Sequence, residues 1–133
     1  MSRLVLICLG GAIGTGARYL LSTWVAERYG TSFPTGTLLI NISGSFLIAV
    51  VMELSLVTGA VPETARLFLT TGVMGGYTTY SSFNYETLKL ASAGAYDTAL
   101  LNVALTVAGA LLGGILGLIA ARYAAGLGAR LAR

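Results

Sequence analysis

The sequence of 133 residues contains no histidine, one cysteine and few charged residues. Without histidine it lacks the side chain that most often acts as a general base near neutral pH. Cys8 has no second cysteine with which to form an intrachain disulfide. No catalytic dyad, metal-ligand cluster or nucleotide-binding loop is present, so we predict that the chain is not an enzyme. The net charge of +3 comes from scattered basic residues, which argues against nucleic acid as a partner.

Charged residues make up only 10% of the chain, whereas soluble domains average about 25%. Hydrophobic residues make up 56%, and the mean hydropathy is +0.82. A charge at the centre of a bilayer costs about 3 kcal/mol on insertion scales, so long uncharged stretches indicate membrane spans. The stretches without any charge are residues 4–17, 29–52, 67–85 and 98–121.

Four apolar segments are long enough to cross the bilayer, since about 20 helical residues cross about 30 Å of hydrocarbon. Arg3 followed by an apolar run is also how a signal peptide begins, but no cleavage site followed by a polar mature domain appears. We therefore predict an all-α membrane protein in which a single transmembrane domain occupies residues 1–133. The predicted spans are residues 4–25, 36–57, 65–92 and 98–123.

The distribution of basic residues bears on the orientation of these spans, because lysine and arginine favour the cytoplasmic side. Four spans place both termini on one side of the membrane. That side carries five basic residues: Arg3, Arg66, Arg122, Arg130 and Arg133. The other side carries three: Arg28, Lys89 and, inside the first span but near that end, Arg18. The bias favours cytoplasmic termini without fixing the orientation.

The 18 glycines lie mostly inside the predicted spans. Several recur at a spacing of four: Gly10 and Gly14, then Gly109, Gly113 and Gly117. Small residues at this spacing let helix backbones approach closely in a membrane. We expect ordinary helix packing at most of these positions, and packing against a second copy of the chain.

The third predicted span has a composition unlike the others. Between Gly72 and Ser82 it contains three glycines, two threonines and two serines, which are poor helix formers. Non-helical backbone survives at membrane depth only where protein or a water-filled cavity surrounds it. Freed carbonyl groups can hold a cation and the broken ends can face an anion. We therefore predict a break near the midplane; the alternative is a continuous helix made flexible by packing glycines.

Other residues in the spans allow two interpretations each. The amide of Asn41 can donate to an anion or make a hydrogen bond between helices. Tyr80 and Phe83 share a helical face and present positive ring edges to an anion, or simply pack.

Charged residues near the span ends are equally open. Arg18 either draws anions into a vestibule or snorkels to the headgroups. For Glu53 and Glu86, we expect the side chains to snorkel to water.

Three segments in the first 90 residues form a recognisable series. Residues 10–19 read Gly-Gly-Ala-Ile-Gly-Thr-Gly-Ala-Arg-Tyr, and residues 36–45 read Gly-Thr-Leu-Leu-Ile-Asn-Ile-Ser-Gly-Ser. Residues 71–83 read Thr-Gly-Val-Met-Gly-Gly-Tyr-Thr-Thr-Tyr-Ser-Ser-Phe. In this order the three segments resemble the span signatures of the bacterial fluoride channel family, CrcB/Fluc. The fourth span resembles the family mainly as a glycine-rich helix.

The resemblance implies a multi-pass protein of the bacterial inner membrane that lets fluoride leave the cell passively. It implies a homodimer of oppositely inserted subunits with two fluoride pathways along the interface. It also implies a structural sodium ion, Na+, at the centre, held by the backbone carbonyl groups of Gly75 and Thr78. Such a fixed cation lowers the cost of placing an anion at the membrane midplane.

By motif position, the resemblance also assigns residues to the fluoride pathway. They are the pore asparagine Asn41, the pore aromatics Tyr80 and Phe83, the polar residues Ser81, Ser82 and Glu86, and the vestibule arginine Arg18. A pore must replace the hydration shell of fluoride with a dense set of donors. Two positions depart from the pattern: Tyr80 replaces phenylalanine, and Ala110 replaces a frequent serine. Thr106, one turn before Ala110, is the candidate replacement donor.

Two other functions fit a small four-span protein. A multidrug exporter needs an acidic residue in the middle of a span for proton coupling, usually the first span. That span has none here, and Glu53 lies late in the second. A structural subunit of a larger complex explains the glycine faces but not the polar third span.

Overall fold

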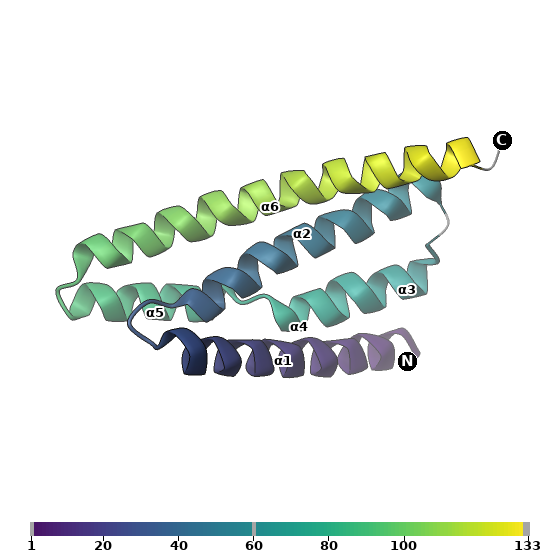
Figure 1. The fold of residues 1–133 in the computed structure, drawn as a ribbon. Helices are drawn as coiled ribbons and strands as arrows, with labels where there is room; N and C mark the ends of the chain where they lie inside the picture. The colour runs from purple at the N-terminus through teal and green to yellow at the C-terminus, as the bar shows by residue number, and fades with distance from the viewer. Residues whose placement is uncertain (1, 60, 132–133) are drawn as a thin grey trace.

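The computed structural model describes residues 2–59 and 61–131, with side chains up to residue 128. Every regular element in these ranges is helical, which confirms the predicted all-α class (Figure 1). Three long helices are α1 (Ser2–Tyr29), α2 (Thr35–Thr58) and α6 (Tyr96–Leu131). Between α2 and α6 lie four shorter elements: α3 (Glu63–Leu67), the π-helix η1 (Phe68–Met74), α4 (Gly75–Tyr77) and α5 (Tyr80–Ser92).

The chain runs back and forth along the bundle, and the first residues of α1 and the last of α6 lie at the same end (Figure 1). Within the described residues, three helices have the length and hydropathy to cross a membrane: Ser2–Tyr29, Thr35–Thr58 and Tyr96–Gly128. Three of the predicted spans fall within them. The remaining predicted span, residues 65–92, falls on the interrupted segment α3–α5.

Short turns with fixed backbone geometry end the helices. Gly59 adopts a left-handed conformation after α2, with φ of 62°, and its N–H donates to the carbonyl of Ser55. Pro62, which cannot continue a preceding helix, then stands at the N-cap of α3. These tight turns return the chain directly onto its neighbours, so the interrupted segment is packed between α1, α2 and α6.

Large apolar side chains cover the outside of the bundle, and its interior is small and partly polar. Leu4, Leu20 and Leu111 are each about two-thirds exposed. The buried residues include the threonines Thr37, Thr70, Thr79 and Thr106, together with Glu53 and Asn102. An apolar exterior of this extent is suited to lipid rather than to water.

Glycines allow close backbone contact along two seams, which confirms the predicted helix packing. Along α1, a Cβ atom on Gly10 would lie 3.0 Å from the Cα of Gly72, and one on Gly14 would lie 2.9 Å from the N of Tyr77. Along α6, a Cβ atom on Gly113 would lie 2.8 Å from the carbonyl oxygen of Ile42 in α2.

Gly109 and Gly117, on either side of Gly113, face α2 in the same way. The recurrent glycines therefore meet partners within one chain. Packing against a second copy stays a prediction, which these contacts within one chain do not test.

Candidate functional site

The interrupted segment loses its helical conformation at two residues. Helix α4 ends at Tyr77, and Thr78 and Thr79 are extended, with ψ of 154° and 107°. Helix α5 then begins at Tyr80. The predicted break is therefore confirmed, and a continuous flexible helix is excluded. The π-helix just before it widens the helical turn, a distortion that is frequent at functional sites.

The side chain of Asn41 holds the extended backbone of Thr79 from the middle of α2. Its Oδ1 accepts from the N–H of Thr79 at 2.9 Å, and its Nδ2 donates to the carbonyl oxygen of Thr79 at 3.1 Å. The interhelical hydrogen bond considered for Asn41 is thus present. An amide NH2 has two hydrogens, and the second has no hydrogen-bond partner in the described part of the chain.

Thr79 caps the new helix and gathers the two following serines. Its Oγ1 accepts from the N–H of Ser82 at 3.2 Å and donates to the hydroxyl of Ser82 at 3.0 Å. The hydroxyl of Ser81 lies 3.3 Å from the same atom. Because Ser82 accepts from Thr79, its own hydroxyl hydrogen is left for another acceptor. Sequence reasoning missed Thr79, although threonine is a favoured N-cap residue.

Arg18 lies against the other side of the break. Its Nε donates to the carbonyl oxygen of Gly76 at 3.2 Å, and the hydroxyl of Thr15 donates to the same oxygen at 3.4 Å. A cation at the C-terminal end of a helical run is favoured by the helix dipole. Neither the vestibule nor the snorkelling interpretation included this contact, and Arg18 is absent from the described linings of the cavities below.

The carbonyl groups of Gly75 and Thr78, predicted to hold a cation, lie at this same helix end. The last carbonyl groups of a helix lack backbone partners within it. No side chain in the described ranges donates to either of these two, and Gly75 is exposed. The same ranges contain no cluster of three or more His, Cys, Asp or Glu side chains able to hold a metal ion. Backbone oxygens are therefore the ligands that this region offers a cation.

A cavity of about 310 Å³ brings several predicted residues together beside the break. Its lining comes from α2, the extended residues, α5 and α6, and includes Asn41, Thr78, Tyr80, Phe83 and Thr106. The rings of Tyr80 and Phe83 have centroids 5.6 Å apart and planes inclined by 57°. Phe83 is 7% exposed whereas Tyr80 is 78% exposed, so Phe83 belongs to the wall and Tyr80 stands at the mouth.

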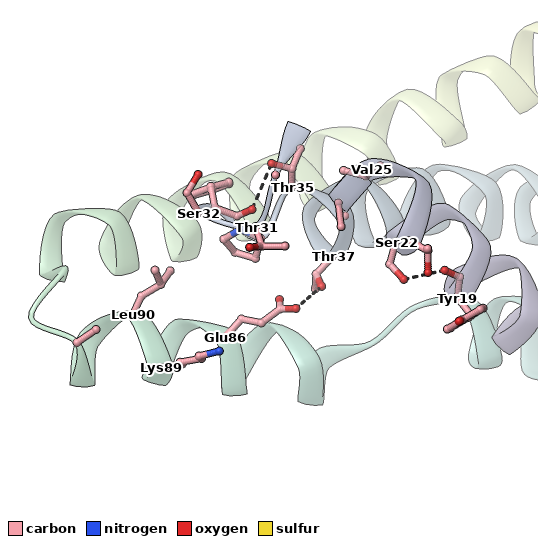
Figure 2. A pocket seen from close by; sticks show the side chains of 17 residues that line it. Tyr19, Ser22, Val25, Thr31, Ser32, Thr35, Thr37, Glu86, Lys89 and Leu90 are labelled. Carbon is pink, nitrogen blue, oxygen red and sulfur yellow. Dashed lines mark hydrogen bonds between the residues drawn. The ribbon is translucent and has the colours of Figure 1, made fainter. Parts of the chain in front are cut away.

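A second cavity, of about 540 Å³, opens between the end of α1, the loop that follows it, the start of α2 and α5 (Figure 2). Glu86 and Lys89 lie in its lining. Figure 2 shows the carboxylate of Glu86 turned toward Thr37, whose hydroxyl donates to Oε1 at 2.9 Å. The other carboxylate oxygen, Oε2, is buried and has no hydrogen-bond partner in the part of the chain that the structure describes.

The expected snorkelling of the two glutamates is wrong. Glu86 turns inward to Thr37, and Glu53 is only 9% exposed and accepts from Nε of Arg122 at 2.6 Å. Each carboxylate has one donor on a neighbouring helix, and Oε2 of Glu86 stays buried without one among the described residues.

The side of the membrane predicted to carry five basic residues lies partly outside the described residues, because Arg133 and the side chain of Arg130 are beyond them.

A polar chain between α5 and α6 was not anticipated. Asn102 is 1% exposed, and its Nδ2 donates to the hydroxyl of Thr87 at 2.8 Å. The hydroxyl of Thr106, a predicted fluoride donor, instead donates to Oδ1 of Asn102 at 3.4 Å. An asparagine inside a charge-free apolar run was the available signal, as it was for Asn41.

Known proteins resemble the chain over nearly its whole length. The model of the CrcB-like protein family, Camphor Resistance (CrcB), matches residues 5–118. A protein of Anaeromyxobacter sp. (strain K) named fluoride-specific ion channel FluC is 53% identical over 126 residues, 95% of this chain and 100% of that relative. A protein of the same name from Sorangium cellulosum is 50% identical over 122 residues, 92% of this chain and 96% of the relative.

Proposed function

We propose, from the membership of this chain in the CrcB-like protein family, that it is a fluoride-selective channel through which fluoride leaves the cell passively. Membership makes it a multi-pass membrane protein of ion transport rather than an enzyme. The observation that carries the proposal is the cavity beside the break, where an amide, the two threonines of the break and two aromatic rings converge; Ser81 and Ser82 lie next to it, outside its lining. The pairing of Glu53 with Arg122 removes the acidic residue that a proton-coupled exporter would use.

Several groups at the break have hydrogens left for an anion. Asn41 keeps one amide hydrogen, Ser82 keeps its hydroxyl hydrogen, and the tyrosine hydroxyl of Tyr80 is exposed. Ring edges carry partial positive charge and accept an anion that has lost part of its water. A dense set of weak donors replaces the hydration shell while still letting the ion go.

The remaining assignments extend this pathway on either side. Glu86 and Ser81 continue it along α5 toward the larger cavity. Arg18 supports the break from α1 through the carbonyl oxygen of Gly76, and Thr106 lines the cavity from α6 while its hydroxyl donates to Asn102.

The carbonyl groups of Gly75 and Thr78 fit a sodium site shared between two chains. A hard cation is held by several oxygen ligands, and one chain offers two carbonyl oxygens here. A second, oppositely inserted copy supplies the same groups again and provides the second pathway. In this arrangement the interrupted segment is the third of four spans. The bound ion supplies positive charge next to the anion path.

Flux from liposomes tests the proposal directly. Purified protein reconstituted into liposomes is expected to release trapped fluoride and to retain trapped chloride, each followed with an ion-selective electrode. A hydrated anion pathway without selectivity would release both ions. Liposomes without protein provide the background. Equal fluoride and chloride efflux contradicts the selectivity, and efflux equal to background for both ions contradicts a channel.

A further inference from the structure

We propose that Asn102 is a positioning residue that fixes the Phe83 wall of the cavity through Thr87. The inference rests on the proposed function, because it concerns the same cavity. Asn102 lies on α6, does not line the cavity, and is 1% exposed, so it has no direct access to a permeating ion. A fully buried amide is retained where its hydrogen bonds hold a particular arrangement.

A relay of two hydrogen bonds joins Asn102 to Phe83. Nδ2 of Asn102 donates to Oγ1 of Thr87 at 2.8 Å. Oγ1 of Thr87 then donates to the carbonyl oxygen of Phe83, one turn earlier on α5, at 2.7 Å. The relay therefore begins on α6 and ends on the backbone of the residue whose ring forms the cavity wall.

The other end of the same amide reaches the opposite wall. Oδ1 of Asn102 accepts from the hydroxyl of Thr106, which lies one turn later on α6 and lines the cavity. A single side chain thus connects the α5 wall at Phe83 to the α6 wall at Thr106. Because this bond takes the only hydrogen of Thr106, Asn102 also sets which side of that hydroxyl faces the cavity.

Helix α5 needs such a connection because it is short. It has 13 residues and begins immediately after extended backbone, so α4 does not fix its rotation about its axis. A change of register by one residue turns a helix by about 100° and would carry Phe83 out of the wall. An interhelical amide–hydroxyl pair has one satisfied geometry, and any rotation leaves a buried polar group unpaired.

Variants of Thr87 test the relay without emptying the interior. Thr87→Val keeps the shape of the side chain and removes the hydroxyl, whereas Thr87→Ser keeps the hydroxyl. Thr58→Val is the matched control, since the Thr58 hydroxyl also donates to a carbonyl four residues earlier but lies at the exposed end of α2. Asn102→Ala removes both connections and is the second variant, used if it remains monodisperse in detergent.

Two measurements are made on each variant. One is fluoride efflux from liposomes, normalised to folded protein. The other is the 19F resonance of 4-fluorophenylalanine placed at position 83, recorded in fluoride-free buffer, which reports the surroundings of the ring whether or not the protein conducts. Thr87→Val is expected to lower efflux about fivefold or more and to shift or broaden the resonance, while Thr87→Ser and Thr58→Val keep both near the parent values.

The resonance separates this inference from the proposed function. If the parent protein releases no fluoride, the channel proposal fails, and the resonance of Thr87→Val alone decides the positioning role. An unchanged resonance in Thr87→Val overturns the inference, whatever the efflux. A loss of efflux in Thr58→Val equal to that in Thr87→Val also overturns it, because the effect would then be a general one of removing a helix hydroxyl.

Discussion

The two halves of the interrupted segment are held in different ways. The half before the break, residues 68–77, lies directly against the backbone of α1, with glycines on both sides of the contact. The half after it, α5, is joined to its neighbours by side-chain hydrogen bonds: Thr37 to Glu86 and Asn102 to Thr87. The first contact is possible because the glycines have no side chain, and the second requires donors and acceptors at matching positions.

The two halves should therefore differ in the kind of substitution that they tolerate. Backbone packed against backbone has no side chain that can move aside, so its geometry is rigid and sensitive to volume. Hydrogen-bonded side chains accept changes of size more easily but lose a full partner when a donor is removed. The break at Thr78 and Thr79 therefore joins a rigid support to a half whose position is set by polar contacts.

Adding one methyl group to the rigid half is expected to have the largest effect. In Gly14→Ala the new Cβ collides with the carbonyl oxygen of Val73 and lies 2.9 Å from the N of Tyr77, both backbone atoms. We expect a loss of about 3 kcal/mol in the free energy of unfolding, the upper end for overpacking. The measurement is the thermal midpoint of the detergent-solubilised protein, read from its monodisperse fraction.

Gly16→Ala is the control on the same helix, because among the described residues no neighbouring element comes within 4 Å of its added Cβ. It is expected to be neutral or to stabilise by up to about 1 kcal/mol, the difference in helix propensity. If both variants lose the same stability, the close backbone contact at Gly14 is not the cause, and the proposed rigid support by α1 is contradicted.

The next largest effect on stability is expected at the break itself, from a substitution that changes the polarity of a side chain but not its volume. Asn41→Asp keeps the acceptor for the N–H of Thr79 but turns a second oxygen toward the carbonyl group of Thr79. We expect the free energy of unfolding to fall by about 2 kcal/mol, because the carbonyl oxygen of Thr79 loses its donor and faces a carboxylate oxygen instead. Fluoride efflux is expected to fall to background, because a carboxylate repels the anion.

Ser43→Ala, half a turn further along α2, is the comparison for this variant. It removes the contact between the Ser43 and Tyr77 hydroxyls, at 2.9 Å, and the bond from Ser43 to the carbonyl oxygen of Leu39 in its own helix. It adds no charge and is expected to cost at most about 1 kcal/mol. Parent-level efflux in Asn41→Asp would remove Asn41 from the fluoride path and leave it as a support for Thr79.

The rigid half was easier to predict from the sequence than the polar half. Glycines at a spacing of four and a stretch of poor helix formers are local signals, and they predicted the α1 seam and the break. The partners of Glu53 and Arg18 lie about 60 or more residues away in the chain, and no local pattern carries such pairings. Asn102 was missed because an isolated amide shows its role only once its neighbours are in place.

The smallest expected effect is at Arg18, where the two halves meet. In Arg18→Gln the carbonyl oxygen of Gly76 loses a charged donor at the end of the helical run, which is expected to cost about 1 kcal/mol of stability. Arg28→Gln, in the exposed last turn of α1, is the matched control and is expected to leave stability unchanged.

Ionic strength distinguishes the two roles considered for Arg18. If its charge draws fluoride toward the pathway, the loss of efflux in Arg18→Gln is largest at about 0.01 M salt and shrinks at about 0.1 M, as the Debye length falls from about 30 Å to about 10 Å. If it only caps the helix end at Gly76, thermal stability falls while the ratio of variant to parent efflux stays constant with salt. We expect the constant ratio, because the guanidinium is already engaged with the backbone and lies outside the described cavity linings. If the ratio of variant to parent efflux rises with salt instead, the charge of Arg18 acts on the permeating anion. This side of the break would then influence fluoride electrostatically as well as hold the backbone in place.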